Sequence, residues 1–161
     1  MEKTVKTNAM RQLDKAGIAY TPLTYEPDEN DLSGVHVAEQ IGIEPERTFK
    51  TLTARGDKTG PVVLVIPADR EIDLKKAAKA TGNKRVELVH VKELLALTGY
   101  IRGGCSPIGM KKKFPTWIHE TALLYDGITV SAGMKGCQLL LDPKKLIPFV
   151  AAEVVDLTAE E

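Results

Sequence analysis

Cysteine, histidine and aromatic side chains are scarce in this chain, and neither sign of charge dominates. The 161 residues include two cysteines, Cys105 and Cys137, which fit no disulfide framework and no CxxC site, so we expect reduced thiols in a cytoplasmic protein. The three histidines, His36, His90 and His119, lie far apart, so no metal site is predicted. Lys plus Arg and Asp plus Glu number 22 each, which excludes a general basic field that would hold nucleic acid tightly.

Long apolar runs are also missing. A membrane-spanning helix needs about 20 consecutive apolar residues, and no stretch approaches that length. The first residues, Met1 to Thr4, lead into a polar amphipathic stretch rather than the apolar core of a secretory signal. With 43% hydrophobic and 27% charged residues, and with no repeat or linker, we expect residues 1–161 to form one globular domain without a membrane anchor.

Helical and strand patterns follow one another irregularly along the chain. Capping residues and apolar periodicity predict helices over residues 4–16, with Val5, Ala9, Leu13 and Ala16 on one face, and over 34–41, 74–81, 91–98 and 142–148. Alternation and short apolar runs predict strands over residues 18–25, 48–55, 62–66, 85–89, 116–119, 128–131, 137–141 and 154–157. The absence of a regular strand–helix–strand rhythm favours an α/β protein of the α+β type, with helices around a mixed or antiparallel sheet curled toward a barrel.

The most informative segment is Gly103-Gly104-Cys105-Ser106-Pro107-Ile108-Gly109, called the glycine loop below. Three glycines and a proline continue neither a helix nor a strand, so the main chain is expected to lie open with several free N–H groups. Such a loop suits a negatively charged oxygen, either a phosphate or the oxyanion of a reacting carbonyl. The three lysines Lys111, Lys112 and Lys113 follow directly and indicate an anionic partner. The alternative for an arbitrary protein is a long turn without a ligand.

Five segments along the chain carry a family resemblance. They are Leu23-Thr24-Tyr25, Phe49-Lys50-Thr51-Leu52, the helix start at residues 73–79, Thr98-Gly99-Tyr100 through Lys112, and Val130-Ser131-Ala132-Gly133. In this order they resemble the YbaK/EbsC family of aminoacyl-tRNA deacylases, relatives of the editing domain inserted in bacterial prolyl-tRNA synthetases. The resemblance implies a mixed, largely antiparallel, barrel-like sheet of six or seven strands surrounded by helices, and it implies no cofactor.

The same resemblance implies an enzyme that removes a mischarged amino acid from tRNA, most characteristically cysteine from tRNA(Pro), with Cys-tRNA(Cys) as a further substrate. In such relatives the lysine matching Lys50 is critical, and the glycine loop and the tyrosine matching Tyr25 shape the pocket. The implied mechanism is attack of the substrate's own thiol on the ester, which releases a thiolactone. Relatives take their tRNA selectivity from prolyl-tRNA synthetase, so a transient complex with that synthetase is expected besides the mischarged tRNA.

Three groups of functional residues are predicted from the loop and the resemblance together. The catalytic group is Lys50, Gly103, Gly104 and Ser106. The substrate-binding group is Tyr25, Thr51, Arg102, Pro107, Gly109 and Ser131. The nucleic-acid-binding group is Lys75, Lys76, Lys79, Lys111, Lys112 and Lys113, which would contact acceptor-stem phosphates if both clusters flank the loop. Structural alternatives stay open, since Lys50 could be a solvated sheet lysine and Tyr25 a core aromatic. Thr51 alternates to the face opposite Lys50, so a joint role would need a twist or a bulge.

The sequence departs from the family pattern in several places. Cys105 stands where relatives carry an aliphatic residue, and no base is adjacent to it, so we interpret it as a small apolar substitute rather than a nucleophile. Ala132 replaces a glycine, Gln138 replaces an aspartate of some relatives, and residues 33–36 replace a Phe-Gly-Asp type of segment. The last two differences concern the choice of substrate more than the class of reaction.

Two other functions fit the same sequence. The scaffold could clear alanine from tRNA(Pro) with water as the nucleophile. It could also be a non-catalytic module that binds tRNA or regulates a synthetase, although a binder alone has no need for both Lys50 and the intact glycine loop.

Overall fold

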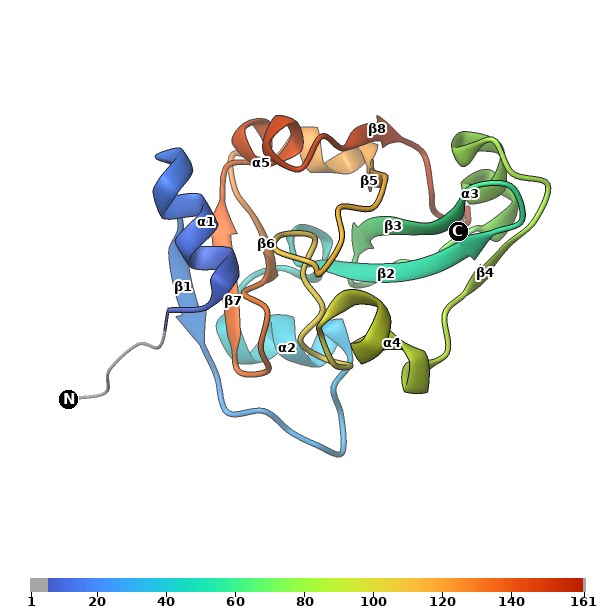
Figure 1. Ribbon diagram of the computed structural model, residues 1–161. Coiled ribbons are helices and arrows are strands. Elements are labelled where there is room, and N and C mark those ends of the chain that lie inside the picture. The colour runs from blue at the N-terminus through green and yellow to red at the C-terminus, as the bar shows by residue number, and fades with distance from the viewer. Residues whose placement is uncertain (1–5, 161) are drawn as a thin grey trace.

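Short helices and two β-sheets make up the fold (Figure 1). The computed structural model describes residues 6–160, so Val5 and the stretch from Met1 to Thr4 lie outside the described residues. The helices are α1 (Asn8–Ala16), α2 (Gly34–Ile41), α3 (Leu74–Thr81), α4 (Val91–Thr98) and α5 (Pro143–Phe149), with 3-10 turns η1 (Pro45–Arg47) and η2 (Glu120–Leu124). None of the helices within residues 6–160 has the length and apolar character needed to cross a bilayer.

The larger sheet has the strand order β4-β2-β3-β5-β8. Its strands are β2 (Phe49–Gly56), β3 (Gly60–Pro67), β4 (Val86–Leu88), β5 (Thr116–His119) and β8 (Glu153–Val155). β2 and β3 form an antiparallel hairpin paired from end to end, and Gly60 supplies the positive φ of +75° that its turn requires. β4 runs antiparallel to β2, whereas β5 pairs parallel with β3 and β8 parallel with β5.

The smaller sheet is antiparallel, with the order β1-β7-β6. Its strands are β1 (Thr21–Thr24), β6 (Ile128–Ser131) and β7 (Cys137–Leu141). A parallel bridge between Thr48 and Thr129 joins it to the start of β2. The predicted mixed, largely antiparallel architecture with surrounding helices is confirmed. Residues 6–160 contain eight strands, the number predicted from local patterns, and they lie in two bridged sheets, whereas the resemblance implied six or seven strands in one barrel-like sheet.

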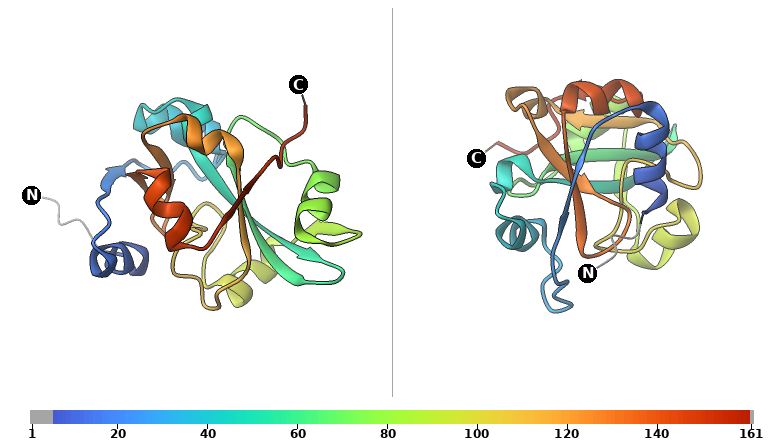
Figure 2. Two further views of the ribbon diagram at one scale, coloured as in Figure 1. Left: turned by 90° about the horizontal axis from the view of Figure 1, so that it is seen from above. Right: turned by 90° about the vertical axis from the view of Figure 1, so that its left-hand side faces the viewer.

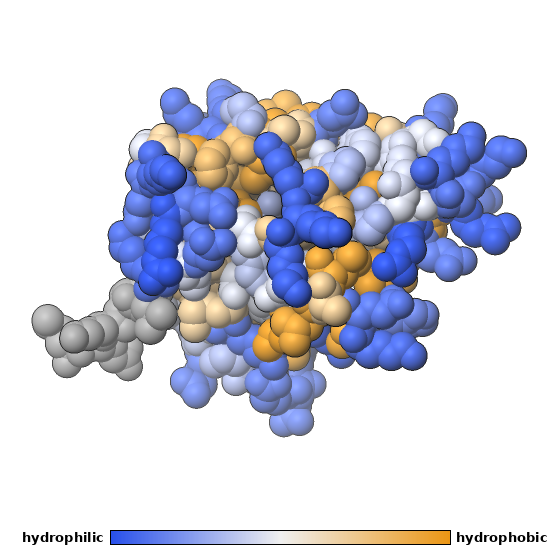
Figure 3. Space-filling view, in the orientation of Figure 1, coloured by the Kyte–Doolittle hydropathy of each residue, from blue (hydrophilic) through white to orange (hydrophobic). Residues whose placement is uncertain are grey.

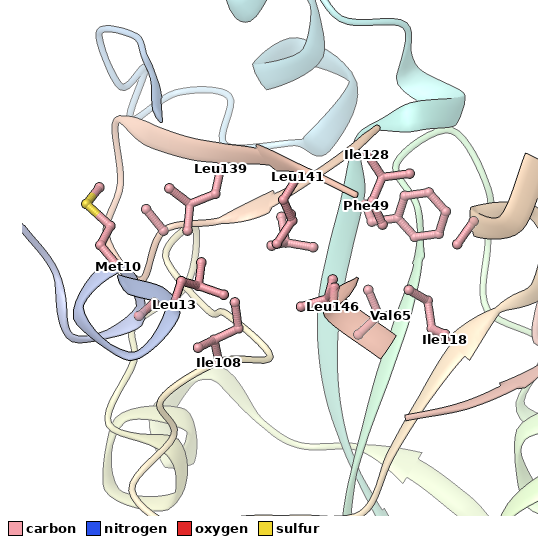
Figure 4. Packing of buried hydrophobic residues seen from close by; sticks show 14 of the residues in the cluster. Met10, Leu13, Phe49, Val65, Ile108, Ile118, Ile128, Leu139, Leu141 and Leu146 are labelled. Atoms are coloured by element: carbon pink, nitrogen blue, oxygen red, sulfur yellow. The ribbon is translucent and has the colours of Figure 1, made fainter. Parts of the chain in front are cut away.

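Two hydrophobic clusters lie on opposite faces of the larger sheet, because side chains alternate along β2 and β3. Val63 and Val65 face the first cluster, and Leu64 and Ile66 face the second. In the first cluster, the labelled side chains of α1, the glycine loop, β7 and α5 converge between the two sheets (Figure 4). α3 covers the second cluster, and its residues Ala77 and Ala78 pack into it. Figure 2 shows the sheets crossing, with α1 and α3 at opposite ends of the molecule.

Helix ends follow the predicted chemistry. Ser33 accepts a hydrogen bond from the N–H of His36 at the start of α2, and Asp73 accepts from the N–H groups of Lys75 and Lys76 at the start of α3. Loss of such a cap costs about 1 kcal/mol. The predicted elements 74–81, 91–98, 116–119, 128–131 and 137–141 are confirmed residue for residue. The first and last predicted strands are shorter than expected, at Thr21–Thr24 and Glu153–Val155.

Candidate functional site

A cavity of about 520 Å³, called the site cavity below, opens beside the first half of β2. Its walls come from residues 32–35 before and in α2, residues 49–53 of β2, and the stretch between β4 and α4. Arg102, Gly103 and Cys105 form the wall opposite, and Ala68, Glu71 and Ser131 complete the lining. The volume lies in the range of roughly 300–1,000 Å³ that small-molecule sites occupy.

A gap in strand pairing creates this opening. The outer edge of β2 meets β6 at the Thr48–Thr129 bridge, and it meets β4 over Ala54–Gly56, with one further bond from the N–H of Val89 to the carbonyl of Thr53. Between these two contacts, residues 49–53 lie along the cavity. Lys50 pairs opposite Ile66 and Thr51 opposite Val65, so their side chains leave opposite faces of the sheet. Both nevertheless line the cavity because it lies at the edge of the strand, and neither a twist nor a bulge is needed to bring them together.

Lys50 brings an uncompensated cation to the site cavity. Its Nζ donates to the carbonyl oxygen of Ala68 at 3.4 Å, which is a long bond, and no ion pair to Lys50 is found among residues 6–160. A half-buried ammonium group with one weak acceptor retains most of its capacity to bind a negative oxygen. Arg102 adds a second cation at the exposed rim, and Glu71 is the one carboxylate that lines the cavity.

Two hydroxyl groups also face this space with hydrogen-bonding capacity to spare. The Oγ1 atom of Thr51 is buried and has no hydrogen-bond partner in the described part of the chain. Ser131 accepts from the N–H of Gly133 at 3.1 Å and keeps its own proton available. An unsatisfied buried polar group costs about 1–3 kcal/mol, so the Thr51 hydroxyl has an unused capacity for one hydrogen bond next to the cavity.

Cys105 lines the cavity as a protonated thiol. Its Sγ lies 3.9 Å from Oγ1 of Thr53, and burial raises the pKa of the thiol to about 11. No histidine is part of the cavity lining that could serve as a base. A thiol with a raised pKa and no histidine in the same lining is a poor nucleophile at neutral pH, which supports its interpretation as a space-filling side chain.

The glycine loop uses part of its own hydrogen-bonding capacity. The N–H of Gly104 donates to the carbonyl of Ile101 at 2.9 Å, and the N–H of Ile108 donates to Oγ of Ser106 at 3.2 Å. Gly104 and Ser106 therefore build the loop and do not line the site cavity. Gly103 does line it, with a φ of +85° that favours glycine, and the described residues supply no acceptor for its N–H.

Tyr100 clamps the loop, and the sequence prediction gave it no site role. Its hydroxyl donates to the carbonyl of Ile108, and burial raises the pKa of this phenol to about 12. A Cβ atom on Gly109 would lie 2.9 Å from the tyrosine oxygen, and one on Gly133 would lie 3.0 Å from its ring. Glycine is favoured at both positions because the tyrosine side chain leaves no room for a Cβ atom and because φ is positive, at +78° and +96°. Its place in the motif Thr98-Gly99-Tyr100 was the available sequence signal.

Other predicted substrate-binding residues lie elsewhere. Pro107 and Gly109 line a second cavity rather than the site cavity. Tyr25 lines neither, and its N–H donates to the carbonyl of Gly136 at 2.9 Å, which extends the pairing of β1 with β7. Of the substrate-binding group, the site cavity therefore brings together Thr51, Arg102 and Ser131.

The predicted nucleic-acid-binding lysines differ in their surroundings. Lys76 is not free, since its Nζ donates at 2.8 Å both to Asp156 and to the carbonyl of Thr158, and the carboxylate raises its pKa. Lys75 and Lys79 are exposed on α3, which contributes no residue to either cavity. The lysines that follow the glycine loop also differ from one another. Lys111 leans back to the carbonyl of Ala96 at 3.5 Å, whereas Lys112 and Lys113 line the second cavity.

Sequence reasoning missed Glu71 and the apolar wall. Glu71 is held in place by the C-terminal segment, because its carbonyl accepts from the N–H of Ala159 at 3.0 Å and the next residue bridges to Thr158. The apolar wall includes Leu88 and Val91, which remain 45% and 60% exposed, and Figure 3 shows apolar surface on this face. Neither feature has a local sequence signal, since both depend on segments that meet only in the folded chain. Within residues 6–160, no group of three His, Cys, Asp or Glu side chains is placed to hold a metal ion.

Comparison with known proteins places the chain in a family. Residues 30–149 match the model of the aminoacyl-tRNA editing domain. The chain is 51% identical to an Enterococcus faecalis protein with the provisional name Cys-tRNA(Pro)/Cys-tRNA(Cys) deacylase EbsC, over 97% of this chain and 95% of the relative. It is 32% identical over 56% of its length to proline–tRNA ligase 1 of Streptomyces avermitilis, of which it covers 16%.

A solved structure gives the same result for the fold. A protein provisionally described as a trans-editing enzyme for prolyl-tRNA synthetase matches with a TM-score of 0.80 at 23% identity, over 96% of this chain and 99% of the other. At that identity the likeness shows a shared fold. Together with the family model and the Enterococcus relative, it establishes that the chain belongs to the aminoacyl-tRNA editing domain family, in the group of EbsC-like proteins.

Proposed function

We propose that the protein is a trans-editing aminoacyl-tRNA deacylase that removes mischarged cysteine from tRNA(Pro), and also cysteine from tRNA(Cys). The observation that carries the proposal is the convergence of Lys50, the unpaired Thr51 hydroxyl and Gly103 of the glycine loop on one cavity. The name of the Enterococcus relative supports the choice of cysteine. The site cavity offers a cation and hydrogen-bond donors, and no histidine lines it to activate its thiol or its hydroxyls.

The proposed chemistry uses a nucleophile that the substrate supplies. The thiol sulfur of the esterified cysteine attacks its own carbonyl carbon, the bond from that carbon to the ribose oxygen breaks, and the thiol proton passes to the departing ribose oxygen. The product is a cysteine thiolactone, which water then opens to free cysteine. Placing a nucleophile next to its target contributes about 7–11 kcal/mol through proximity. The task of the protein is then to fix the reactive geometry and to stabilise the developing oxyanion.

Each polar group of the site cavity has a proposed task in this reaction. Lys50 faces the developing negative charge of the carbonyl oxygen, and the N–H of Gly103 donates to the same oxygen. Thr51 donates to the ester or to the ribose. Glu71 accepts from the α-ammonium group that every aminoacyl ester carries. The apolar wall from Leu88 to Leu94 covers the terminal ribose and adenine.

The decisive experiment is deacylation of Cys-, Ala- and Pro-tRNA(Pro) and of Cys-tRNA(Cys), with rapid trapping of products. The proposal expects Cys-tRNA to be hydrolysed far faster than Ala-tRNA, with thiolactone as the first product. Ala-tRNA(Pro) hydrolysed as fast as Cys-tRNA(Pro), with no thiolactone trapped, indicates a water-based alanine deacylase instead. Tight binding of every substrate without turnover indicates a binding module.

Selectivity among tRNAs is proposed to come from prolyl-tRNA synthetase in a transient cytoplasmic complex. The chain has no net charge, and Asp156 neutralises Lys76 of the α3 cluster. Little of the protein surface is therefore suited to binding the body of a tRNA through its phosphates. Adding the synthetase should therefore raise the ratio of the rates on Cys-tRNA(Pro) and Cys-tRNA(Cys). An unchanged ratio at saturating synthetase would remove the partner from the proposal.

A further inference from the structure

A second cavity, of about 340 Å³, lies against the later half of the glycine loop. Residues 107–110 form one wall, Gln12 of α1 and Thr116 of β5 stand beside it, and the end of α5 closes it. Extending the proposed deacylase function, on which this inference rests, we propose that this cavity binds the nucleotide preceding the terminal adenosine of the tRNA acceptor end. It is called the nucleotide cavity below.

The lining of the nucleotide cavity combines the three kinds of group that a nucleotide requires. Phe114 and Phe149 are half-buried rings with faces on which a base can stack. Gln12 presents an exposed amide that can both donate to and accept from a base edge. Lys112 and Lys113 are exposed, and no ion pair to either is found in the described part of the chain, so they are available to a phosphate.

Other ligand classes match only part of this lining. A small carboxylate would occupy the lysines and leave both aromatic rings without a partner. An acyl chain would cover the rings and leave the two ammonium groups and the amide unused. A nucleotide has a flat base joined to a phosphate, so it uses all of these groups at once.

The glycine loop runs from one cavity to the other. Gly103 and Cys105 line the site cavity, and Pro107 is the first loop residue that lines the nucleotide cavity. Only Ser106 separates Cys105 from Pro107 along the chain, so the Cα atoms of these two residues lie at most about 7 Å apart. A terminal adenosine seated with its ester against the first part of the loop therefore places the preceding nucleotide beside the second part.

The surface between the cavities also suits a nucleic-acid backbone. In Figure 1 the segment after α4 (yellow to gold) crosses the middle of the front face, and in Figure 3 a hydrophilic ridge lies there with apolar surface on either side. Lys112 and Lys113 belong to this segment and border the nucleotide cavity. A phosphate that joins the two nucleotides would cross the ridge where these cations are.

A binding experiment tests the inference without any chemistry. The probes are the dinucleotide CpA and adenosine, neither of which carries an amino acid, and affinity is measured by calorimetry or NMR titration. CpA is expected to bind about tenfold more tightly than adenosine, since one stacked base and one phosphate are added. Phe114→Leu keeps an apolar side chain in the wall but removes one stacking face, so it should reduce this ratio about threefold or more, while the phosphate contacts of the lysines remain. The matched aromatic control Tyr125→Leu, outside both cavities, should leave the ratio unchanged.

A kinetic experiment adds the charge argument. The double variant Lys112→Glu/Lys113→Glu should raise KM for a cysteinylated CCA minihelix about tenfold or more relative to KM for 3′-cysteinyl-adenosine. Lys144→Glu/Lys145→Glu makes the same change of charge on exposed residues of α5 and should leave that ratio at the wild-type value. Circular dichroism confirms that each variant is folded.

The outcomes separate this inference from the proposed function. Equal affinity of the wild type for CpA and adenosine overturns the nucleotide cavity, even if deacylation is intact. If both double variants raise the KM ratio equally, Lys112 and Lys113 have no specific role, and the effect comes from the change in the net charge of the protein. Preferential binding of CpA by a protein that hydrolyses no aminoacyl-tRNA supports the nucleotide cavity and refutes the deacylase.

Discussion

Replacing Lys50 by methionine separates catalysis from folding. The ammonium group makes one long bond, of 3.4 Å, to the carbonyl of Ala68, and residues 6–160 provide it with no ion pair. Methionine has a similar length and an apolar stem that suits the neighbouring Phe49 and Leu52. The free energy of unfolding should therefore change by no more than about 0.5 kcal/mol.

The expected loss of activity is much larger. A fixed charge or donor at a developing oxyanion is worth about 2.7–4 kcal/mol, which corresponds to a loss of about 10²–10³ in kcat. Lys50→Arg keeps the charge but replaces the compact ammonium group by a planar fork, so it should recover only part of the rate. The matched control is Lys58→Met in the exposed β2–β3 turn, which should keep wild-type activity.

Single-turnover deacylation of Cys-tRNA(Pro) and urea unfolding of the same preparations provide the two measurements. The reasoning is refuted if folded Lys50→Met retains activity within tenfold of the wild type. It is also refuted if the variant loses more than about 2 kcal/mol of stability, because Lys50 would then be a structural residue whose loss disturbs the site indirectly.

Three further predictions follow from the same geometry. Tyr100→Phe removes the donor to the carbonyl of Ile108, so it should lower the free energy of unfolding in urea by about 1–2 kcal/mol and also lower kcat; unchanged values for both would show that the clamp is dispensable. Cys105→Ala should deacylate within about threefold of the wild type, because its thiol, with a pKa of about 11, is protonated; a loss beyond a hundredfold would make it a nucleophile. Burial lowers the pKa of His119, so the unfolded chain takes up a proton that the folded chain does not, and stability should fall as the pH drops below about 6.5, by at most about 1.4 kcal/mol per unit. His119→Asn should flatten this part of a urea-stability profile between pH 5 and 7.5, and an equally steep profile would assign the loss to other groups.

Most of the helices and strands could be predicted from the sequence, because caps and apolar runs lie within the segments that they define. The Asp73 cap and Gly82 delimit α3, and short buried apolar runs give β5, β6 and β7 to the residue. The division into two sheets was not predictable in the same way. β1 pairs with β7 from the other end of the chain, and β5 joins the larger sheet parallel to β3 after two intervening helices, so no pattern within either segment identifies its partner.

The site residues, too, were predicted where the signal was local and missed where it depended on distant segments. The predicted convergence of Lys50 with the glycine loop is present in the geometry, since Lys50 and Gly103 line one cavity. Glu71 went unnoticed because its place in the wall depends on the C-terminal segment. Lys75 and Lys76 are equivalent in sequence, yet Asp156 neutralises only the second, and that carboxylate lies far along the chain.

Backbone hydrogen bonds from residues 157–159 support the segment that carries Glu71. Ala159 donates to the carbonyl of Glu71, and the carbonyl of Leu157 accepts from the N–H of Asp73, so residues 157–159 support one wall of the cavity that would bind substrate. Trimming the chain before Leu157 would remove both bonds and leave this wall without its support. Protein intended for activity measurements should therefore keep residues 157–159.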